Sequence, residues 1–330
     1  MRYGLSSPSM RTLFLPLAAL PLLAAVPACA ETIYVTNERG NSITVIDGAT
    51  LKPVATWPVG KRPRGIVLSR DGKQLYVCAS DENAVQVIDR ATGEVVADLP
   101  SGEDPETFAL SPDGKLLLAS NERDATVTAI DVPNRTVAFQ VVVGVEPEGM
   151  AISPDGKVAV STSETDNALH WLDLATHQPI AETAVEARPR HAEFTADGRH
   201  LWASAEIGGT VQVVDTATHK VTDTIRFAPP ATNPDKVLPV GIRFTPDGKT
   251  ALVALGRANS VAVIDVATRK VTGYVSVGQR VWQVAIAADG ARAFSANGLS
   301  DDVSVIDLKT NKVVGTVPAG RAPWGLTIAP

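Results

Sequence analysis

The sequence predicts an all-β fold in which seven four-stranded antiparallel sheets close into a ring. Three observations carry this prediction: an aspartate that recurs at a regular interval, a turn that recurs with it, and an incomplete repeat at each end of the array. The aspartates are Asp47, Asp89, Asp131, Asp173, Asp215, Asp265 and Asp307, and they are separated by 42, 42, 42, 42, 50 and 42 residues. A period this regular is typical of an array of one supersecondary unit.

The recurring turn has the sequence Ser/Thr-Pro-Asp-Gly-Lys or a close variant. It occurs at 69–73, 111–115, 153–157, 195–199, 245–249 and 287–291. Proline suits a φ of about −65° and glycine suits a positive φ, so each segment predicts a tight turn between antiparallel strands. The turn's aspartate follows the preceding repeat aspartate by 24 residues, except at Asp247, which follows Asp215 by 32. The additional residues belong to one loop, 227–238, which is either functional or merely tolerated length.

Each repeat contains four short segments rich in Val, Ile and Leu. In the first complete repeat they are 64–69, 74–79, 84–89 and 94–99, and turn residues separate them. Segments of this length and composition predict strands, and no stretch has a helical period. In six of the seven repeats a threonine follows the aspartate by three residues. We therefore expect the aspartates to be structural, with their carboxylates capping backbone amides of the next turn.

The two ends of the array supply the third observation. Strands predicted at 32–36, 42–47 and 52–58 match the second, third and fourth strands of a repeat, and 324–329 matches a first strand. If these four strands share one sheet, the ring closes and no long sheet edge stays exposed. The predicted fold is a seven-bladed β-propeller whose last blade combines one C-terminal strand with three N-terminal strands.

The repeat motifs resemble those of a known family. Residues 34–37 read Tyr-Val-Thr-Asn, the tetrapeptide that names the YVTN-repeat β-propellers, and the SPDGK turns and Val-x-Val-Ile-Asp strands match that repeat along the chain. The sequence looks most like the propellers associated with pyrroloquinoline-quinone (PQQ) dependent alcohol catabolism. The resemblance implies a periplasmic quinoprotein dehydrogenase or cytochrome as partner, with PQQ reaching this protein only through that partner. It supplies no catalytic residues.

The first 30 residues are expected to be a cleaved signal peptide, which leaves 31–330 as the propeller and places it in the periplasm. Arg11 precedes an uncharged apolar run, 12–26, and Ala28-Cys29-Ala30 forms a small-x-small cleavage site. The run is too short to span a bilayer. A competing interpretation, in which Cys29 is lipidated, stays open. The net charge of −6 argues against a nucleic-acid partner, which requires a basic surface.

One face of the predicted ring carries the most varied chemistry. The loops that enter each first strand, and the loops between the second and third strands, emerge there around the central channel, where ligands are expected to bind. The entry position holds Arg64, Glu106, Glu148, Arg190, Val240, Trp282 and Trp324 in the seven blades, and His191 follows Arg190. We take Arg64, Glu106, Glu148, Arg190, His191, Trp282 and Trp324 as the candidate ligand-binding residues.

These residues allow two interpretations each. The charged ones either perform acid-base or anion-binding chemistry or form a salt-bridged rim without a substrate. In an enzyme, His191 or Glu148 acts as base and Arg64 and Arg190 hold the anion. The tryptophans form an aromatic wall for a flat ligand or only pack blades together. Five second-to-third loops carry Glu38, Glu82, Glu122, Glu164 and Glu206, which either accept turn hydrogen bonds or form an acidic ring that binds a cation or positions arginines; we assign no metal site.

Three functions follow from this reading. The first is a non-catalytic periplasmic binding or scaffold protein that works with a PQQ-linked alcohol oxidation system. The second is a lactone hydrolase, because lactonase propellers have similar SPDGK repeats. The third is a structural module of the cell envelope. The sequence contains no phosphate loop, dinucleotide glycine pattern, haem CxxCH motif or nucleophile elbow.

Overall fold

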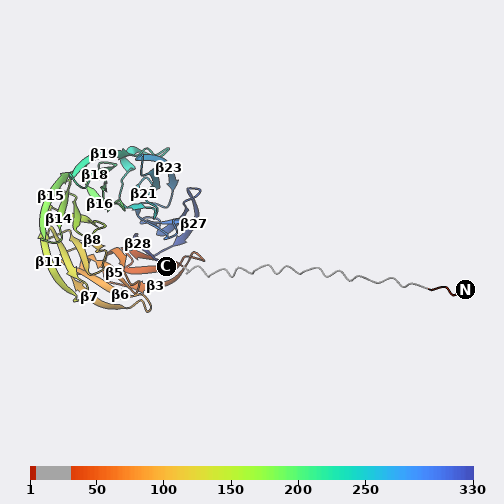
Figure 1. Cartoon of the computed structure of the whole chain (residues 1–330). Coiled ribbons are helices and arrows are strands. Elements are labelled where there is room, and N and C mark those ends of the chain that lie inside the picture. The colour runs from red at the N-terminus through yellow and green to blue at the C-terminus, as the bar shows by residue number, and fades with distance from the viewer. Residues whose placement is uncertain (5–30) are drawn as a thin grey trace.

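The computed structural model describes residues 1–4 and 31–330, and its strands form a closed ring of seven sheets (Figure 1). The predicted cleavage site and the question of Cys29 lipidation lie outside the described residues. Every sheet has four antiparallel strands; in six of them the strands follow sequence order from the channel outward, and in the seventh β28 precedes β1, β2 and β3. The predicted seven-bladed all-β propeller is therefore confirmed.

The blades are numbered I to VII from the first complete repeat. Blade I contains β4 (Pro63–Leu68), β5 (Gln74–Ala79), β6 (Ala84–Asp89) and β7 (Val95–Pro100). Blade II contains β8 (Pro105–Leu110), β9 (Leu116–Asn121), β10 (Thr126–Asp131) and β11 (Thr136–Val142). Blade III contains β12 (Pro147–Ile152), β13 (Val158–Ser163), β14 (Ala168–Asp173) and β15 (Gln178–Ala184). Blade IV contains β16 (Pro189–Phe194), β17 (His200–Ala205), β18 (Thr210–Asp215) and β19 (Lys220–Arg226).

The remaining three blades follow the same pattern. Blade V contains β20 (Ile242–Phe244), β21 (Thr250–Ala254), β22 (Ser260–Asp265) and β23 (Lys270–Ser276). Blade VI contains β24 (Val281–Ile286), β25 (Arg292–Asn297), β26 (Asp302–Asp307) and β27 (Lys312–Pro318). Blade VII contains β28 (Pro323–Ala329), β1 (Thr32–Asn37), β2 (Ser42–Asp47) and β3 (Lys52–Pro58).

Blade VII closes the ring by pairing the two ends of the chain. β28 runs antiparallel to β1, with Ile33 opposite Ile328 and Val35 opposite Leu326. Figure 1 shows the C-terminus beside the N-terminal strands of this blade. Closure satisfies the inner edge of β1, as the incomplete repeats predicted.

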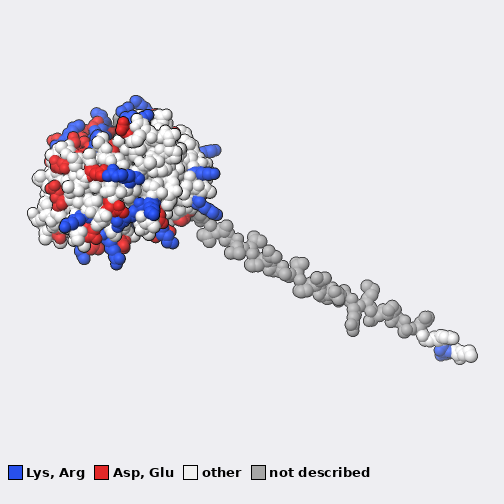
Figure 2. All heavy atoms as spheres, turned by 90° about the horizontal axis from the view of Figure 1, so that it is seen from above, with Lys and Arg blue, Asp and Glu red and all other residues white. Residues whose placement is uncertain are grey.

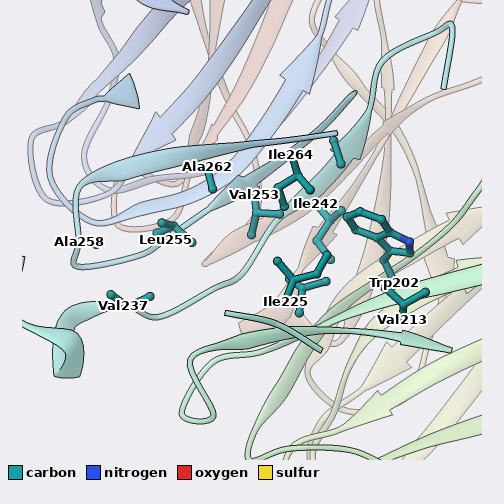
Figure 3. Packing of buried hydrophobic residues seen from close by; sticks show 12 residues of the cluster. Trp202, Val213, Ile225, Val237, Ile242, Val253, Leu255, Ala258, Ala262 and Ile264 are labelled. Carbon is teal, nitrogen blue, oxygen red and sulfur yellow. The ribbon is translucent and has the colours of Figure 1, made fainter. Parts of the chain in front are cut away.

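The hydrophobic core is divided among the interfaces between neighbouring blades. Seven clusters of buried residues join the seven pairs of adjacent blades. In the cluster between blades IV and V, Trp202, Val213 and Ile225 face Ile242 and Val253 (Figure 3). Each sheet is thus covered on both faces, which explains the nearly continuous apolar sequences of the second strands.

The repeat aspartates are structural, as expected. Each accepts a hydrogen bond from the backbone amide three residues later; in blade IV, Thr218 N lies 2.8 Å from Asp215 Oδ1 and Thr218 Oγ1 lies 2.7 Å from it. The Asp-Gly turns have the predicted geometry, since Gly72 has a φ of 71°. These turns define the Asp-Gly face of the ring, opposite the rim face that carries the strand-entry loops.

The additional loop, 227–238, is anchored to the core. Val237 is buried in the cluster between blades IV and V, and the Ala228 amide donates to Tyr274 Oη at 2.7 Å. A short 3-10 turn, η2 (Pro234–Lys236), is capped by Asn233, whose side chain accepts a hydrogen bond from the Asp235 amide. The loop is therefore packed and hydrogen-bonded against the rim face.

The surface carries both signs of charge. Figure 2 shows basic and acidic side chains interspersed over much of the molecule, next to an area without charged residues. Among the described residues, no helix is long and apolar enough to span a bilayer.

Replacing Ile33 by alanine should destabilise the closure. Ile33 lies in β1, is fully buried, and packs in the cluster between blades VI and VII. Truncating a buried isoleucine to alanine costs about 2–5 kcal/mol. We expect a loss of this size in the free energy of unfolding, measured by urea denaturation. The matched control is Ile180→Ala, because Ile180 is 47% exposed and its truncation should cost much less. Equal losses for the two variants would contradict a closure that depends on packing.

Candidate functional site

The entry residues of the seven inner strands form a layer of charged and aromatic side chains, which we call the rim. It comprises the six predicted residues Arg64, Glu106, Glu148, Arg190, Trp282 and Trp324, the apolar Val240, and the loop carboxylates and arginines bonded to them. Arg64 reaches from β4 to Glu38 in a second-to-third loop, with Nη2 2.9 Å from Oε1. Both kinds of loop therefore meet on one face, as predicted.

Arg190 is the centre of one half of the rim. It is 4% exposed in its side chain and forms ion pairs with Glu148, at 2.8 Å, and with Glu164; Glu206 lies 3.6 Å away. Burial raises the pKa of Glu148 well above its usual range, although Arg190 opposes this. Burial also acts to raise the pKa of Glu164, but Arg190, a hydrogen bond with Glu148 and Arg188 together outweigh it, and the pKa is lowered. Glu164 is therefore the ionised partner of Arg190.

Arg64 and Arg62 organise the other half. Both guanidinium groups bond the carboxylate of Glu106, which is fully buried, and Arg62 also pairs with Asp104. Burial raises the pKa of Glu106 to about 7, with the charge of Arg64 acting in the opposite direction. At neutral pH this carboxyl group is divided between its two protonation states.

Carboxylates gather beside these arginines. One oxygen each of Asp104, Glu106 and Glu122 lie within 4.8 Å of one another. Arg62 and Arg64 bond this group, and Arg123 Nε lies 3.2 Å from Asp104. The side chains of the protein itself supply positive charge here, so the cluster alone does not indicate a metal site.

The five loop glutamates have different roles. Glu38, Glu164 and Glu206 pair with rim arginines, which is the arginine-positioning role considered above. Glu122 belongs to the carboxylate cluster, and Glu82 accepts from the backbone amide of Lys61 at 3.2 Å. The repetition in the sequence therefore does not reflect a single structural function.

The two tryptophans of the rim pack against its arginines. The ring centroids of Trp282 and Trp324 are 6.2 Å apart, with planes inclined by 32°. The guanidinium carbon of Arg280 lies 3.7 Å from the Trp282 centroid, and that of Arg64 lies 5.6 Å from the Trp324 centroid. Cations over aromatic faces are stabilising. Arginines thus already cover part of the expected aromatic wall.

His191 lies below the rim and has other partners than expected. Its Nε2 is 3.4 Å from Glu193 Oε2 and 2.9 Å from Arg243 Nη1. The sequence grouped it instead with Glu148, Arg190 and Arg64. Burial lowers the pKa of His191, so the imidazole is neutral at pH 7. Burial acts to raise the pKa of Glu193, but Arg243 and His191 outweigh it and the carboxylate stays ionised.

These three residues line a cavity of about 440 Å³ inside the ring, which we call the channel cavity. Other lining residues come from the inner strands of further blades, including Phe108, Met150, Phe194, Gln283, Trp324 and Leu326. Arg70 and Pro154 of two Asp-Gly turns also line it, so it opens toward the Asp-Gly face. Of the seven predicted residues, only His191 and Trp324 line this cavity.

Sequence reasoning missed Glu193 and Arg243, although a signal was present. Three residues beyond the entry position, the inner strands carry Val67, Ala109, Ala151, Glu193, Arg243, Ala285 and Thr327. A carboxylate and a guanidinium at equivalent positions of adjacent blades stand out against small neutral residues.

Replacing Arg190 by methionine should destabilise the protein strongly. The change removes the buried counter-charge of Glu164, which keeps only the half-exposed Arg188, and it removes the partner of Glu148; losing one partner of a buried ion pair costs about 3–5 kcal/mol. We expect this decrease in the free energy of unfolding at pH 7, measured by urea denaturation. Arg199→Met is the matched control, because the Arg199 side chain is 81% exposed. If the two variants were equally stable, the rim ion pairs would contribute no net stability.

Glu106→Gln should change the pH dependence of stability. Glu106 has a pKa of about 7 in the folded protein and 4.5 as its ordinary value, so its contribution is complete below pH 4.5 and lost as the pH rises through 7. In this window the wild-type free energy of unfolding should fall relative to the variant, by about 1 kcal/mol per pH unit at most. Urea denaturation between pH 4.5 and 8 measures the difference. Exposed Glu103→Gln is the control, and parallel curves for wild type and Glu106→Gln would contradict the assignment.

Comparison with known proteins places the fold. A family model described as "Lactonase, 7-bladed beta-propeller" matches residues 147–317, and a model described as "YNCE-like beta-propeller" matches residues 25–107. No curated protein matches the chain significantly.

Solved structures with the same fold have diverse names. Hydrazine synthase of Kuenenia stuttgartiensis is 21% identical, with a TM-score of 0.77 over 84% of this chain and 92% of that chain. A putative 6-phosphogluconolactonase of Bacteroides fragilis is 18% identical, with a TM-score of 0.77 over 93% and 99%. The dihydro-heme d1 dehydrogenase NirN in complex with DHE is 18% identical, with a TM-score of 0.67 over 94% and 77%. These likenesses concern the fold alone; the family model, which spans more than half of the sequence, shows that the chain belongs to the seven-bladed lactonase-type β-propeller family.

Proposed function

We propose that the protein is a non-catalytic binding propeller of the periplasm that works beside a PQQ-dependent alcohol-oxidising dehydrogenase or its cytochrome. The observation that carries the proposal is the ion pairing among the charged groups of the rim. Arg190 is bonded to Glu148 and Glu164, and Arg64 to Glu38 and Glu106. A catalytic base needs to reach a substrate proton, whereas these buried groups are held by one another. A fixed layer of this kind suits a docking surface.

The partner and compartment rest on further support. The Tyr-Val-Thr-Asn tetrapeptide resembles the YVTN-repeat propellers, and within that family a seven-repeat chain with an apolar segment like a signal peptide, 12–26, looks most like the PQQ-associated members. Two similar folds carry the names of redox enzymes, hydrazine synthase and a dihydro-heme d1 dehydrogenase. PQQ enters this proposal through the partner, and the propeller contributes a surface.

Direct binding tests the proposal. We expect the purified protein to bind a purified quinoprotein alcohol dehydrogenase or its cytochrome, measured by biolayer interferometry at low and physiological salt. Charge reversal at exposed Lys61 or Arg123 of the rim face should weaken binding several-fold, because charges at an interface edge steer association. Lys249→Glu, on the Asp-Gly face, is the matched control. Absence of binding, or an equal effect of the control, would contradict the proposal.

A lactone hydrolase is the second candidate, favoured by the family match and by the channel cavity. Neutral His191 contacts Glu193 and Arg243 through the same ring nitrogen, Nε2, so an imidazole, a carboxylate and a cationic group that could hold an anion lie together in the cavity.

A lactone assay separates the two candidates. With a panel of lactones, with and without calcium, we expect no turnover above the blank. Turnover that is lost in His191→Ala and kept in His177→Ala, a turn histidine outside the cavity, would overturn the non-catalytic proposal. If the protein shows no turnover and does not bind the redox partner, the remaining function is that of a structural module of the cell envelope.

A further inference from the structure

The geometry points to a binding site for small organic carboxylates in the channel cavity, entered from the Asp-Gly face. This site lies in the channel beneath the rim proposed to dock a partner, and it does not depend on that partner. Four features of the described residues carry the inference: the size of the cavity, a half-occupied arginine, two unpartnered buried polar atoms and the balance of charge.

The cavity has the size and walls of a small-molecule site. Its volume of about 440 Å³ lies within the range of ligand pockets, about 300–1,000 Å³. Apolar side chains from several blades line it, including Phe108, Met150, Phe194 and Leu326. A ligand with an aromatic or aliphatic body would contact these walls, which an inorganic anion cannot do.

Arg243 presents a free edge to the cavity. Its Nη1 makes all of its hydrogen bonds, to Glu193, to His191 Nε2 at 2.9 Å and to the Ile242 carbonyl at 2.9 Å. Among residues 31–330 no acceptor bonds its Nε or Nη2, and its side chain is 37% exposed. Donors on one edge of a guanidinium match the two oxygens of a carboxylate. Glu193 and His191 fix the orientation of this edge.

Two further lining residues hold buried polar atoms without partners. Trp324 Nε1 and Gln283 Oε1 have no hydrogen-bond partner among the described residues, and the side chains are 1% and 7% exposed. Buried polar atoms are nearly always satisfied in folded proteins. The indole N–H is a donor that suits a carboxylate or carbonyl oxygen, and a glutamine amide can offer either polarity. Polar atoms on a bound ligand would supply the missing hydrogen-bond partners of Trp324 Nε1 and Gln283 Oε1.

The charge around the cavity selects an anion. Arg70 and Arg243 are cationic and Glu193 is anionic, while His191 is neutral because burial lowers its pKa. Arg70 is held at the entrance by the backbone carbonyls of Leu110 and Ser111. A cationic ligand would be repelled by Arg243, and the carboxylate of Glu193 is already paired with that arginine. One free guanidinium edge matches a monocarboxylate.

Probes that differ in charge but share a ring test the site. Benzoate, its neutral analogue benzamide and the cation benzamidinium are titrated into the purified protein by calorimetry, with hexanoate as a flexible carboxylate. We expect saturable binding of a carboxylate at millimolar concentration or below, with a change in tryptophan fluorescence from Trp324. Benzamide should bind about tenfold more weakly and benzamidinium not measurably. Equal affinity for the three ring probes, or no saturation by either carboxylate, would overturn the inference.

Variants place the binding in the cavity. Arg243→Gln should lower benzoate affinity about tenfold and remove the difference from benzamide, whereas Arg199→Gln, an exposed arginine of the same face, should leave it unchanged. Arg243→Gln leaves the carboxylate of Glu193 without its ion pair. If this variant unfolds, the double variant Arg243→Gln/Glu193→Gln replaces it in the binding measurement. Trp324→Phe keeps the ring, removes the Nε1 donor and should weaken binding several-fold. Unchanged benzoate affinity in the folded Arg243 variants would place the carboxylate elsewhere and refute the site.

Discussion

Every blade depends on its neighbours, because a four-stranded sheet with two apolar faces cannot cover either face alone. The seven clusters of buried residues all lie between adjacent blades, so the core is complete only when the ring is closed. The pairing of β28 with β1 is the step that completes it. Without that pairing, two blade faces and one strand edge would be exposed to water at once.

Closure also concentrates charge at the centre. The inner strands converge on one axis, so entry residues that are far apart in sequence come within bonding distance; Arg64 meets Glu106, and Arg190 meets Glu148. The chain balances these charges by placing the two glutamates between the two arginines and by adding loop carboxylates such as Glu164 and Glu206. Burial acts to raise the pKa of both glutamates, and the neighbours of Glu164 reverse this effect there, so Glu148 is favoured as the neutral form and Glu164 as the charged form. The same packing that forms the core thus sets the electrostatics of the rim.

The repeat made the fold predictable, because the 42-residue period, the turns and the half-repeats are local patterns that specify a global arrangement. The pattern also predicted which residues occupy the rim. It did not predict the partners of His191, because Glu193 and Arg243 meet it only through the twist and packing of blades IV and V. Nor did it predict that Arg280 would cover Trp282, since Arg280 lies in a loop whose path the repeat leaves open. Contacts between blades depend on side-chain direction, which periodicity does not encode.

The pairing of the two ends within blade VII separates the connectivity of the chain from its architecture. Thr32 and Ala329 are opposite each other on adjacent strands, so a short peptide could join them without disturbing the sheet. New ends could then be introduced at the exposed part of the loop 227–238, giving a circularly permuted chain. In such a chain blade VII would be continuous in sequence, and a covalent link would join two strands that are now held together by strand pairing and packing. The order of the blades along the sequence is therefore a property of this chain and not a requirement of the propeller fold.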